Sequence, residues 1–436
     1  MRSFSGGWLF VAALLLVACE PGTDTGEGGS GGSGGGGGAG GGPPVLEVVP
    51  GAPAPLADTP EQATFTMDGY ATSAATREGI TVAGTTIGAH VAGVDGLTQL
   101  PIEGDDPELP AETGIVRAAA PIETGVLVAA EAGLFVAGPG ALTLSNGHAG
   151  LHPLGILGMK SRLADDDNDG TPEAHLVLLT NAGLVEWSSG ETVTWTIGTE
   201  QGPPSAAFSR KDLLFAAWGT RVYEVDREGG VAYPLVFDIG AVTDIACSSQ
   251  ACDEGSLVYF ATDKGLVERS AEGGYTLYPL APEGEPGVAV KSFALDAGKQ
   301  RLYAFTETSV LRVRAGHVPD EVASLGKADF DRHAAVDKAG DLWSFAGGEA
   351  TRLSTGTPLS FATDIQPIMG EYCAPCHKSG SNGAPAIDFE SYDKMLEYAD
   401  KAVARVQDSS MPPPTWPQVP KDQVQLLVEW VATKAP

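Results

Sequence analysis

A degenerate repeat is the feature of this sequence that most restricts its fold. Between residues 62 and 359 a short run of alternating apolar residues recurs, followed by a turn and a second apolar run that Gly-Leu often opens. Seven copies start near Thr81, Val126, Leu176, Leu214, Val258, Leu302 and Leu342. Successive starts lie 38 to 50 residues apart. Repeats of this length, built from strands without helices, are typical of β-propeller blades.

Such a repeat predicts a ring of blades, because a hairpin alone cannot bury both of its faces and must stack on its neighbours. The pattern resembles bacterial propellers of the two-component-regulator and quinoprotein-like type. We expect a mainly-β domain over residues 62–359, with seven blades as the first choice and six or eight as alternatives. A β-sandwich, or a pair of sandwiches, remains the competing fold.

The N-terminus carries the pattern of an export signal. Arg2 precedes an apolar run from Trp8 to Ala18 that has the size of a signal peptide and is too short to span a bilayer. The run ends Leu-Val-Ala-Cys, which resembles the lipobox of bacterial lipoproteins. The resemblance implies removal of residues 1–18 and lipidation of Cys19, so we expect an exported protein, lipid-anchored at the bacterial cell envelope, in the periplasm or at the cell surface. A plain signal peptide followed by an incidental cysteine is the alternative.

Residues 19–61 read as the anchor and a linker. Positions 26–42 are almost entirely glycine and serine, a composition that cannot bury surface and stays flexible. The Pro-rich stretch from Pro43 to Pro60 is expected to continue the tether as a stiffer piece.

The net charge narrows the partners that this chain can bind. Its 56 acidic and 26 basic residues give a formal charge of −30, which argues against nucleic-acid binding. The acidity either keeps an exported protein soluble or steers a basic redox protein toward it.

An Asp-rich stretch in the propeller region suggests a calcium site. Residues 165–173 read Asp-Asp-Asp-Asn-Asp-Gly-Thr-Pro-Glu, and alternate carboxylates on a tight glycine turn suit the hard oxygen ligands of Ca²⁺. The predicted ligands are Asp165, Asp167, Asp169 and Glu173. The twelfth loop position is a leucine and no helices flank the loop, so it is not an EF-hand; it resembles the Asp-rich loops of integrin-type propellers. An acidic turn that only stays solvated is the alternative.

Cys247 and Cys252 form a close pair in a polar loop. In an exported protein they are expected to form a disulfide that pins a hairpin loop. A metal site is disfavoured because no further cysteine or histidine is near them in the sequence.

The C-terminal region contains the motif Cys373-Ala-Pro-Cys376-His377. Two thiols at this spacing add to the two vinyl groups of haem, and the imidazole of the next residue then binds the iron. A thioredoxin-like redox pair is the competing interpretation, but that pair occurs in a βαβ context. Here the flanking segments show helical periodicity, and a capping box at residues 363–366 is expected to start the helix that leads into the motif.

Residues 360–436 resemble the small class I cytochromes c, an all-α family. The resemblance implies covalent haem c, packing of the first helix against the last, and a methionine as the second axial ligand of the iron. Met411, followed by three prolines and placed just before the final helix, matches the ligand loop of that family. Met369 and Met395 fall on helix faces and are expected to be core residues.

Three functions fit this organisation. The first is a membrane-anchored c-type cytochrome that transfers single electrons, with the propeller docking a redox protein partner. The second is a quinoprotein-like propeller oxidoreductase that passes electrons to the fused haem; it would need a polar cluster with histidine, arginine and Ca²⁺ at the propeller centre. The third is a surface-binding or sensor protein. A propeller fold by itself does not choose among them.

Overall fold

The structure is a computed structural model of the whole chain. It describes residues 45–56, 60–77, 79–93, 96–104, 112–145, 148, 151, 155–166, 171–188, 190–197, 200, 202–227, 229–297, 299–328, 331–355, 361–377, 389, 391–407, 410–413 and 415–433. Cys19 and the export signal therefore lie outside the described residues.

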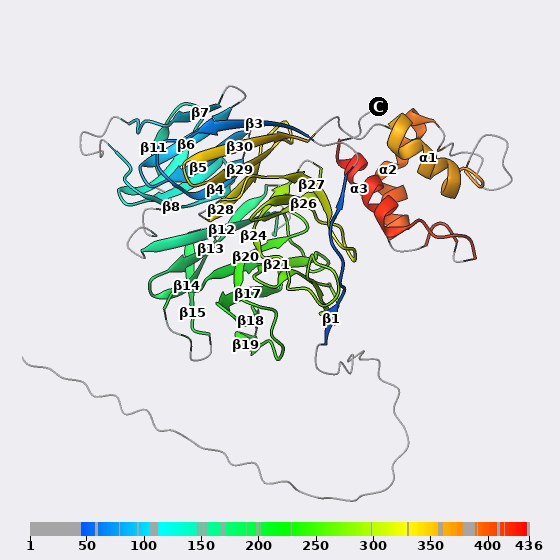
Figure 1. The fold of residues 1–436 in the computed structure, drawn as a ribbon, viewed down its shortest axis with the longest axis horizontal. Helices are drawn as coiled ribbons and strands as arrows, with labels where there is room; N and C mark the ends of the chain where they lie inside the picture. The colour runs from blue at the N-terminus through cyan, green and yellow to red at the C-terminus, as the bar shows by residue number, and fades with distance from the viewer. Residues whose placement is uncertain are drawn as a thin grey trace, which may run out of the picture. The chain divides into compact units, whose positions relative to one another are not determined.

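The described residues between 61 and 354 form a seven-bladed β-propeller (Figure 1). The first three blades are four-stranded sheets. Blade 1 contains β4 (Ala71–Arg77), β5 (Ile80–Thr85), β6 (Gly88–Gly93) and β7 (Gly96–Gln99). Blade 2 contains β8 (Val116–Ile122), β9 (Gly125–Ala130), β10 (Gly133–Ala137) and β11 (Leu142–Leu144). Blade 3 contains β12 (Ile156–Ala164), β13 (Glu173–Thr180), β14 (Gly183–Ser188) and β15 (Glu191–Trp195).

The remaining blades repeat this order. Blade 4 contains β16 (Ala206–Ser209), β17 (Leu213–Trp218), β18 (Arg221–Asp226) and β19 (Val231–Pro234). Blade 5 contains β20 (Val242–Cys247), β21 (Val258–Thr262), β22 (Gly265–Arg269) and β23 (Tyr275–Tyr278). Blade 6 contains β24 (Val290–Asp296), β25 (Arg301–Thr306), β26 (Ser309–Arg312) and β27 (Asp320–Ser324). Blade 7 contains β28 (Arg332–Val336), β29 (Leu342–Ala346), β30 (Glu349–Ser354) and β3 (Glu61–Thr66).

Blade 7 closes the ring with strands from both ends of the propeller. β3 pairs antiparallel with β30, in register from Glu61 opposite Ser354 to Thr66 opposite Glu349. The first strands of the seven blades contact one another in a closed circle, from β4 through β28 and back to β4. Closure of this kind leaves each blade face covered by a neighbour, which is why the strands of the second position are almost entirely buried.

The predicted repeat coincides with the blades. Each of the seven predicted starts falls on the second strand of a blade, and the Gly-Leu pairs begin third strands such as β10, β14 and β22. The expectation of seven blades is therefore confirmed, and the β-sandwich is wrong.

The C-terminal part of the expected linker belongs to the propeller. β1 (Leu46–Val48) pairs parallel with β23, and β2 (Ala54–Pro55) pairs parallel with β27. Blades 5 and 6 consequently have five strands. Residues 45–56 differ here from the stiff tether expected from their prolines, because the open backbone edges of two outer strands supply hydrogen bonds that composition does not reveal.

A threonine stabilises the turn between the second and third strands of four blades. The residues are Thr85, Thr180, Thr262 and Thr306, and all four are buried. Each hydroxyl donates to the carbonyl of the residue three positions later and accepts the N–H two positions later. In three of these turns the third strand begins with a glycine at positive φ, as in Gly265 (φ 138°).

The C-terminal segment is helical and has its own apolar core. It contains η2 (Phe361–Ile365), α1 (Gln366–Ile368), η3 (Met369–Cys373), α2 (Tyr392–Gln407) and α3 (Lys421–Thr433). The first three run on as one stretch with π-helical turns at both ends, and α3 contacts both η2 and α2. None of the helices in the described residues is long and apolar enough to cross a membrane.

Gly265→Ala should destabilise the propeller more than Gly183→Ala. Both glycines begin a third strand at similar φ, 138° and 129°. A Cβ on Gly265 would lie 2.2 Å from the carbonyl oxygen of Tyr278, whereas one on Gly183 would meet no atom within 4 Å. We expect a loss of about 1 kcal/mol for Gly183→Ala and roughly 2 kcal/mol more for Gly265→Ala, measured as urea-unfolding midpoints. Equal losses would contradict this account of the turn.

Candidate functional site

The C-x-x-C-H residues lie in one tight turn that follows η3. The carbonyl oxygen of Cys373 accepts the N–H of Cys376 at 3.1 Å and the N–H of His377 at 2.9 Å. The two cysteines form no disulfide with each other, and both are half-buried. The turn thus holds two thiols and one imidazole close together on a short stretch of backbone.

Apolar side chains from all the helical elements form a cluster against which the beginning of this turn packs. The cluster contains Phe361, Ile365, Ile368, Met369, Phe389, Met395, Ala399, Val403, Val406, Val419, Leu427 and Trp430, with Tyr372 and Cys373 packed against it. The expected core positions of Met369 and Met395 are confirmed, because they are 1% and 0% exposed. A core made by so few residues is small for an independent unit and would gain from a large apolar group.

The imidazole of His377 is half-buried and packs against an aromatic ring. Its ring packs against Phe389 with the ring centroids 5.1 Å apart, and its carbonyl oxygen accepts the N–H of Phe389. Burial lowers the pKa of His377 below its usual value, so the ring is uncharged near neutral pH. Its buried Nδ1 has no hydrogen-bond partner among the described residues. A neutral imidazole is the form that coordinates metals.

The thiol of Cys373 does not have the electrostatics of a redox nucleophile. Burial, together with the neighbouring Cys376, raises the pKa of Cys373 to about 11. Thiol–disulfide oxidoreductases depend on a lowered cysteine pKa, since the thiolate is the reactive form. The described elements around the motif are helical and contain no strand, so the thioredoxin-like alternative finds no support in its surroundings either.

Met411 lies in a separate loop between α2 and α3. Its N–H and that of Ser410 both donate to the carbonyl oxygen of Arg405, at 3.0 Å each. The side-chain amide of Gln418 donates to the carbonyl oxygens of Pro412 (2.9 Å) and Pro413 (3.2 Å). The loop is therefore tied at both ends, while the Met411 residue is 43% exposed.

Only part of the Asp-rich stretch belongs to the described residues. Asp167 and Asp169, two of the predicted calcium ligands, lie outside the described residues, whereas Asp165 is described at the end of β12 and Glu173 at the start of β13. The described residues contain no group of three or more His, Cys, Asp or Glu side chains that could hold a metal ion. The calcium site stays a prediction.

Asp166, which was not among the predicted ligands, is held by an arginine and a histidine. Arg162, 1% exposed, donates to both carboxylate oxygens of Asp166 at 3.0 and 2.6 Å, and Nε2 of His175 lies 3.2 Å from one of them. The hydrogen bond from Arg162 lowers the pKa of Asp166. The carboxylate is thus occupied within the fold, and no spacing in the sequence indicated this pair, because Arg162 lies on β12 and Asp166 in the loop after it.

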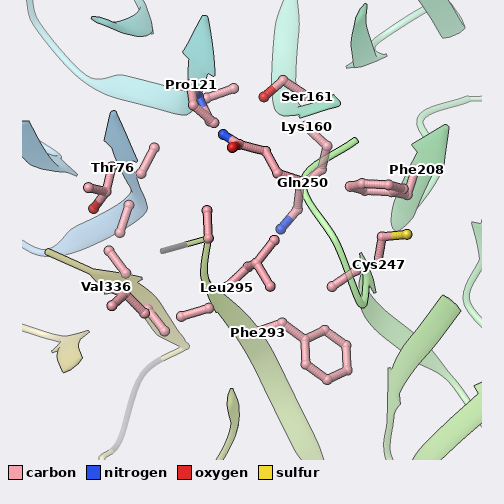
Figure 2. Close-up of a pocket in the computed structure, with 18 of the residues that line it drawn as sticks. Thr76, Pro121, Lys160, Ser161, Phe208, Cys247, Gln250, Phe293, Leu295 and Val336 are labelled. Carbon is pink, nitrogen blue, oxygen red and sulfur yellow. The ribbon is translucent and has the colours of Figure 1, made fainter. Parts of the chain in front are cut away.

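Cys247 and Cys252 form the expected disulfide. The loop that it closes carries Gln250, whose side chain points into the central channel of the propeller (Figure 2). Gln250 is also tied to blade 3, since its carbonyl oxygen accepts the N–H of Leu163 at 3.2 Å. The disulfide therefore fixes a loop that narrows one part of the channel.

A second group of polar residues occurs in that channel, and the sequence did not predict it. Lys160 on β12 reaches Asp244 on β20, with Nζ 2.7 Å from Oδ1, across the intervening blade 4. Two cavities adjoin this pair: one of about 390 Å³ near the beginnings of the first strands, and one of about 170 Å³ nearer their ends, lined by Gln250. Arg332 and His333 line the larger one; burial lowers the pKa of His333, so it is uncharged near neutral pH.

No protein-family model and no curated protein matches the chain. Three similar solved structures are the extracellular domain of a hybrid two-component system protein from B. thetaiotaomicron, virginiamycin B lyase from Staphylococcus aureus, and the WD40 β-propeller domain of Doa1. They are 14%, 12% and 10% identical to this chain, cover 66%, 67% and 68% of it, and have TM-scores of 0.47, 0.44 and 0.47. The chain covers 40%, 99% and 96% of these structures. The propeller assignment rests on the sheets of the chain itself.

Removing the disulfide should lower stability by roughly 2 kcal/mol, the loop-entropy value for so short a ring. The double variant Cys247→Ala, Cys252→Ala would show this loss in urea unfolding. Reductant should produce a similar loss in the wild-type protein and none in the variant. A wild-type midpoint that does not respond to reductant under unfolding conditions would contradict the expectation.

His175 should make the propeller sensitive to acid. Burial, reinforced by Arg162, lowers its pKa from 6.5 to about 4. Between these pH values the unfolded chain binds more protons than the folded one, so the free energy of unfolding falls as the pH drops through this window. We expect the stability advantage of the wild type over His175→Gln to shrink by roughly 2–3 kcal/mol from pH 7 to pH 4.5, measured by urea unfolding. A constant difference would contradict it.

Proposed function

We propose that residues 360–436 bind haem c covalently and that the protein transfers single electrons. The observation that carries this proposal is the turn in which the carbonyl oxygen of Cys373 accepts the N–H groups of Cys376 and His377. It presents two thiols and a neutral imidazole in the order that covalent haem attachment uses. Haem bound there would supply the one-electron couple of its iron.

The surroundings of the turn support this proposal. Cys373 packs against the apolar cluster of the helical segment, so a planar apolar group attached through it would enlarge that core. The raised pKa of the Cys373 thiol argues against the competing use of the pair in disulfide exchange.

Met411 is proposed as the second axial ligand. Its loop is anchored by Arg405 and Gln418, while the side chain remains partly exposed and available. A histidine and a methionine would fill both axial positions of the iron. Filled positions suit electron transfer and leave no site for activating a substrate.

We propose that the other parts of the chain bring the helical segment close to a redox protein partner. Cys19 would carry the lipid anchor at the bacterial cell envelope, and a redox protein would be the partner. The strongly acidic chain would favour a basic one. A calcium ion held by Asp165, Asp167, Asp169 and Glu173 would serve structure only.

A binding or sensor role for the propeller is the second candidate, and the cavity in its channel favours it. A quinoprotein-like enzyme has less support. The channel does carry Arg332 and His333, but the described residues offer no group of side chains that could hold the accompanying Ca²⁺.

The haem proposal predicts a stain that survives denaturation. Wild-type protein should keep haem on a denaturing gel and show sharp reduced bands in the visible spectrum. The double variant Cys373→Ala, Cys376→Ala should lose the stain completely. Met411→Leu should keep the stain but lose the low-spin spectrum of histidine–methionine ligation.

The matched control is Met395→Leu, which changes a buried core methionine and should keep both the stain and the spectrum. An unstained wild-type chain would refute covalent haem. A spectrum unchanged in Met411→Leu would refute Met411 as a ligand and leave the attachment intact.

A further inference from the structure

A glutamine side chain holds the loop that carries Met411. The side-chain nitrogen of Gln418 donates to three carbonyl oxygens of this loop. They belong to Pro412, at 2.9 Å, Pro413, at 3.2 Å, and Trp416, at 3.2 Å. The N–H of Trp416 also donates to the carbonyl oxygen of Pro413, at 2.8 Å. One side chain therefore ties together three backbone groups between α2 and α3.

The composition of the loop explains why it needs such a donor. Five of the ten residues from 411 to 420 are prolines, and a proline has no backbone N–H. Their carbonyl oxygens remain acceptors, so the backbone of this loop has more acceptors than donors. The amide of a glutamine carries two N–H donors at the end of its side chain. Gln418 thus supplies donors that the backbone of the loop lacks.

The backbone of the loop, more than burial, fixes the position of Met411. Pro412 is buried, and Val419, 8% exposed, belongs to the apolar cluster of the helical segment. These two residues anchor the loop at the start and the end of the stretch that Gln418 bridges. Met411 directly precedes the first anchor, and its N–H donates to the carbonyl oxygen of Arg405. Since the Met411 residue is 43% exposed, contacts of its own side chain contribute less.

We infer that Gln418 is a positioning residue for Met411, a role that rests on the proposed haem site. A side chain that binds iron from a flexible loop must first lose the conformational freedom of that loop. In a loop that is already ordered, folding has removed this freedom beforehand. By fixing the carbonyls that follow Met411, Gln418 would keep the thioether available to the iron and make its displacement by another ligand harder.

Binding of imidazole to the oxidised, haem-loaded full chain tests this role, because imidazole competes with Met411 for one axial position. The affinity is measured by titration in the visible spectrum. Gln418→Leu removes the amide, and Gln418→Glu keeps the length of the side chain but replaces its donors by acceptors. Both variants should bind imidazole roughly tenfold more tightly than the wild type, the effect of losing one or two hydrogen bonds.

A double variant separates a positioning role from a purely structural one. In Met411→Leu there is no thioether for imidazole to displace, so adding Gln418→Leu should no longer change the affinity. A tenfold change that persists in this background would overturn the action through Met411. The matched control is Gln407→Leu, at an exposed glutamine that ends α2, and it should bind imidazole like the wild type.

The remaining outcomes distinguish this role from the proposed function. If the wild type carries covalent haem and both Gln418 variants bind imidazole like the wild type, the role of Gln418 is overturned and the proposed function stands. A wild-type chain without covalent haem would overturn both. A visible spectrum unchanged in Met411→Leu would overturn Met411 as a ligand, and the role of Gln418 with it, while covalent attachment would stand.

Discussion

The pairing of β3 with β30 is the interaction on which the rest of the propeller depends. The four inner strands of each of the other six blades are consecutive in the chain, but the fourth strand of blade 7 comes from residues 61–66, which pair with residues 349–354. Without that pairing blade 7 would keep only three strands, and the ring would be held shut only by contacts of its innermost strands. The cost of joining segments nearly three hundred residues apart rises only slowly with loop length, so one six-residue ladder, with the packing behind it, can close the ring.

The second and third strands of each blade can be recognised in the sequence, and the reason is physical. These strands carry the apolar runs and the glycine turns, and local chemistry dictates both, as the clash predicted at Gly265 illustrates. The innermost strands are hard to recognise: β8 contains Ala118, Ala119 and Ala120, because neighbouring blades bury both of its faces and leave no alternation to detect. β1 and β2 escape recognition because backbone pairing to an edge requires no particular side chains.

The two candidate sites differ in the same way. The sequence alone identifies the motif of Cys373, Cys376 and His377, because its chemistry depends on a spacing within five residues. The structure adds the turn and the buried surroundings. Met411 was assigned by resemblance, since no local rule connects it to a histidine 34 residues earlier. Lys160, Asp244 and His333 come from three different blades, so the closed ring alone brings them to one cavity and no pattern in the chain could have grouped them.

The placement of charge in this acidic protein bears on both sites. A chain with a formal charge of −30 creates a negative field, which stabilises buried cations such as Arg332 and opposes entry of anions from solution. Inside the channel the nearby charges have a stronger effect than distant surface carboxylates, because the dielectric constant is lower there and solvent screens the surface charges. In the channel Lys160 is paired with Asp244, and Asp331 lines the same cavity, so charges of both signs lie close together there. Charge on the outer surface and charge in the channel therefore act at different distances, the first on an approaching protein and the second only on groups inside the channel.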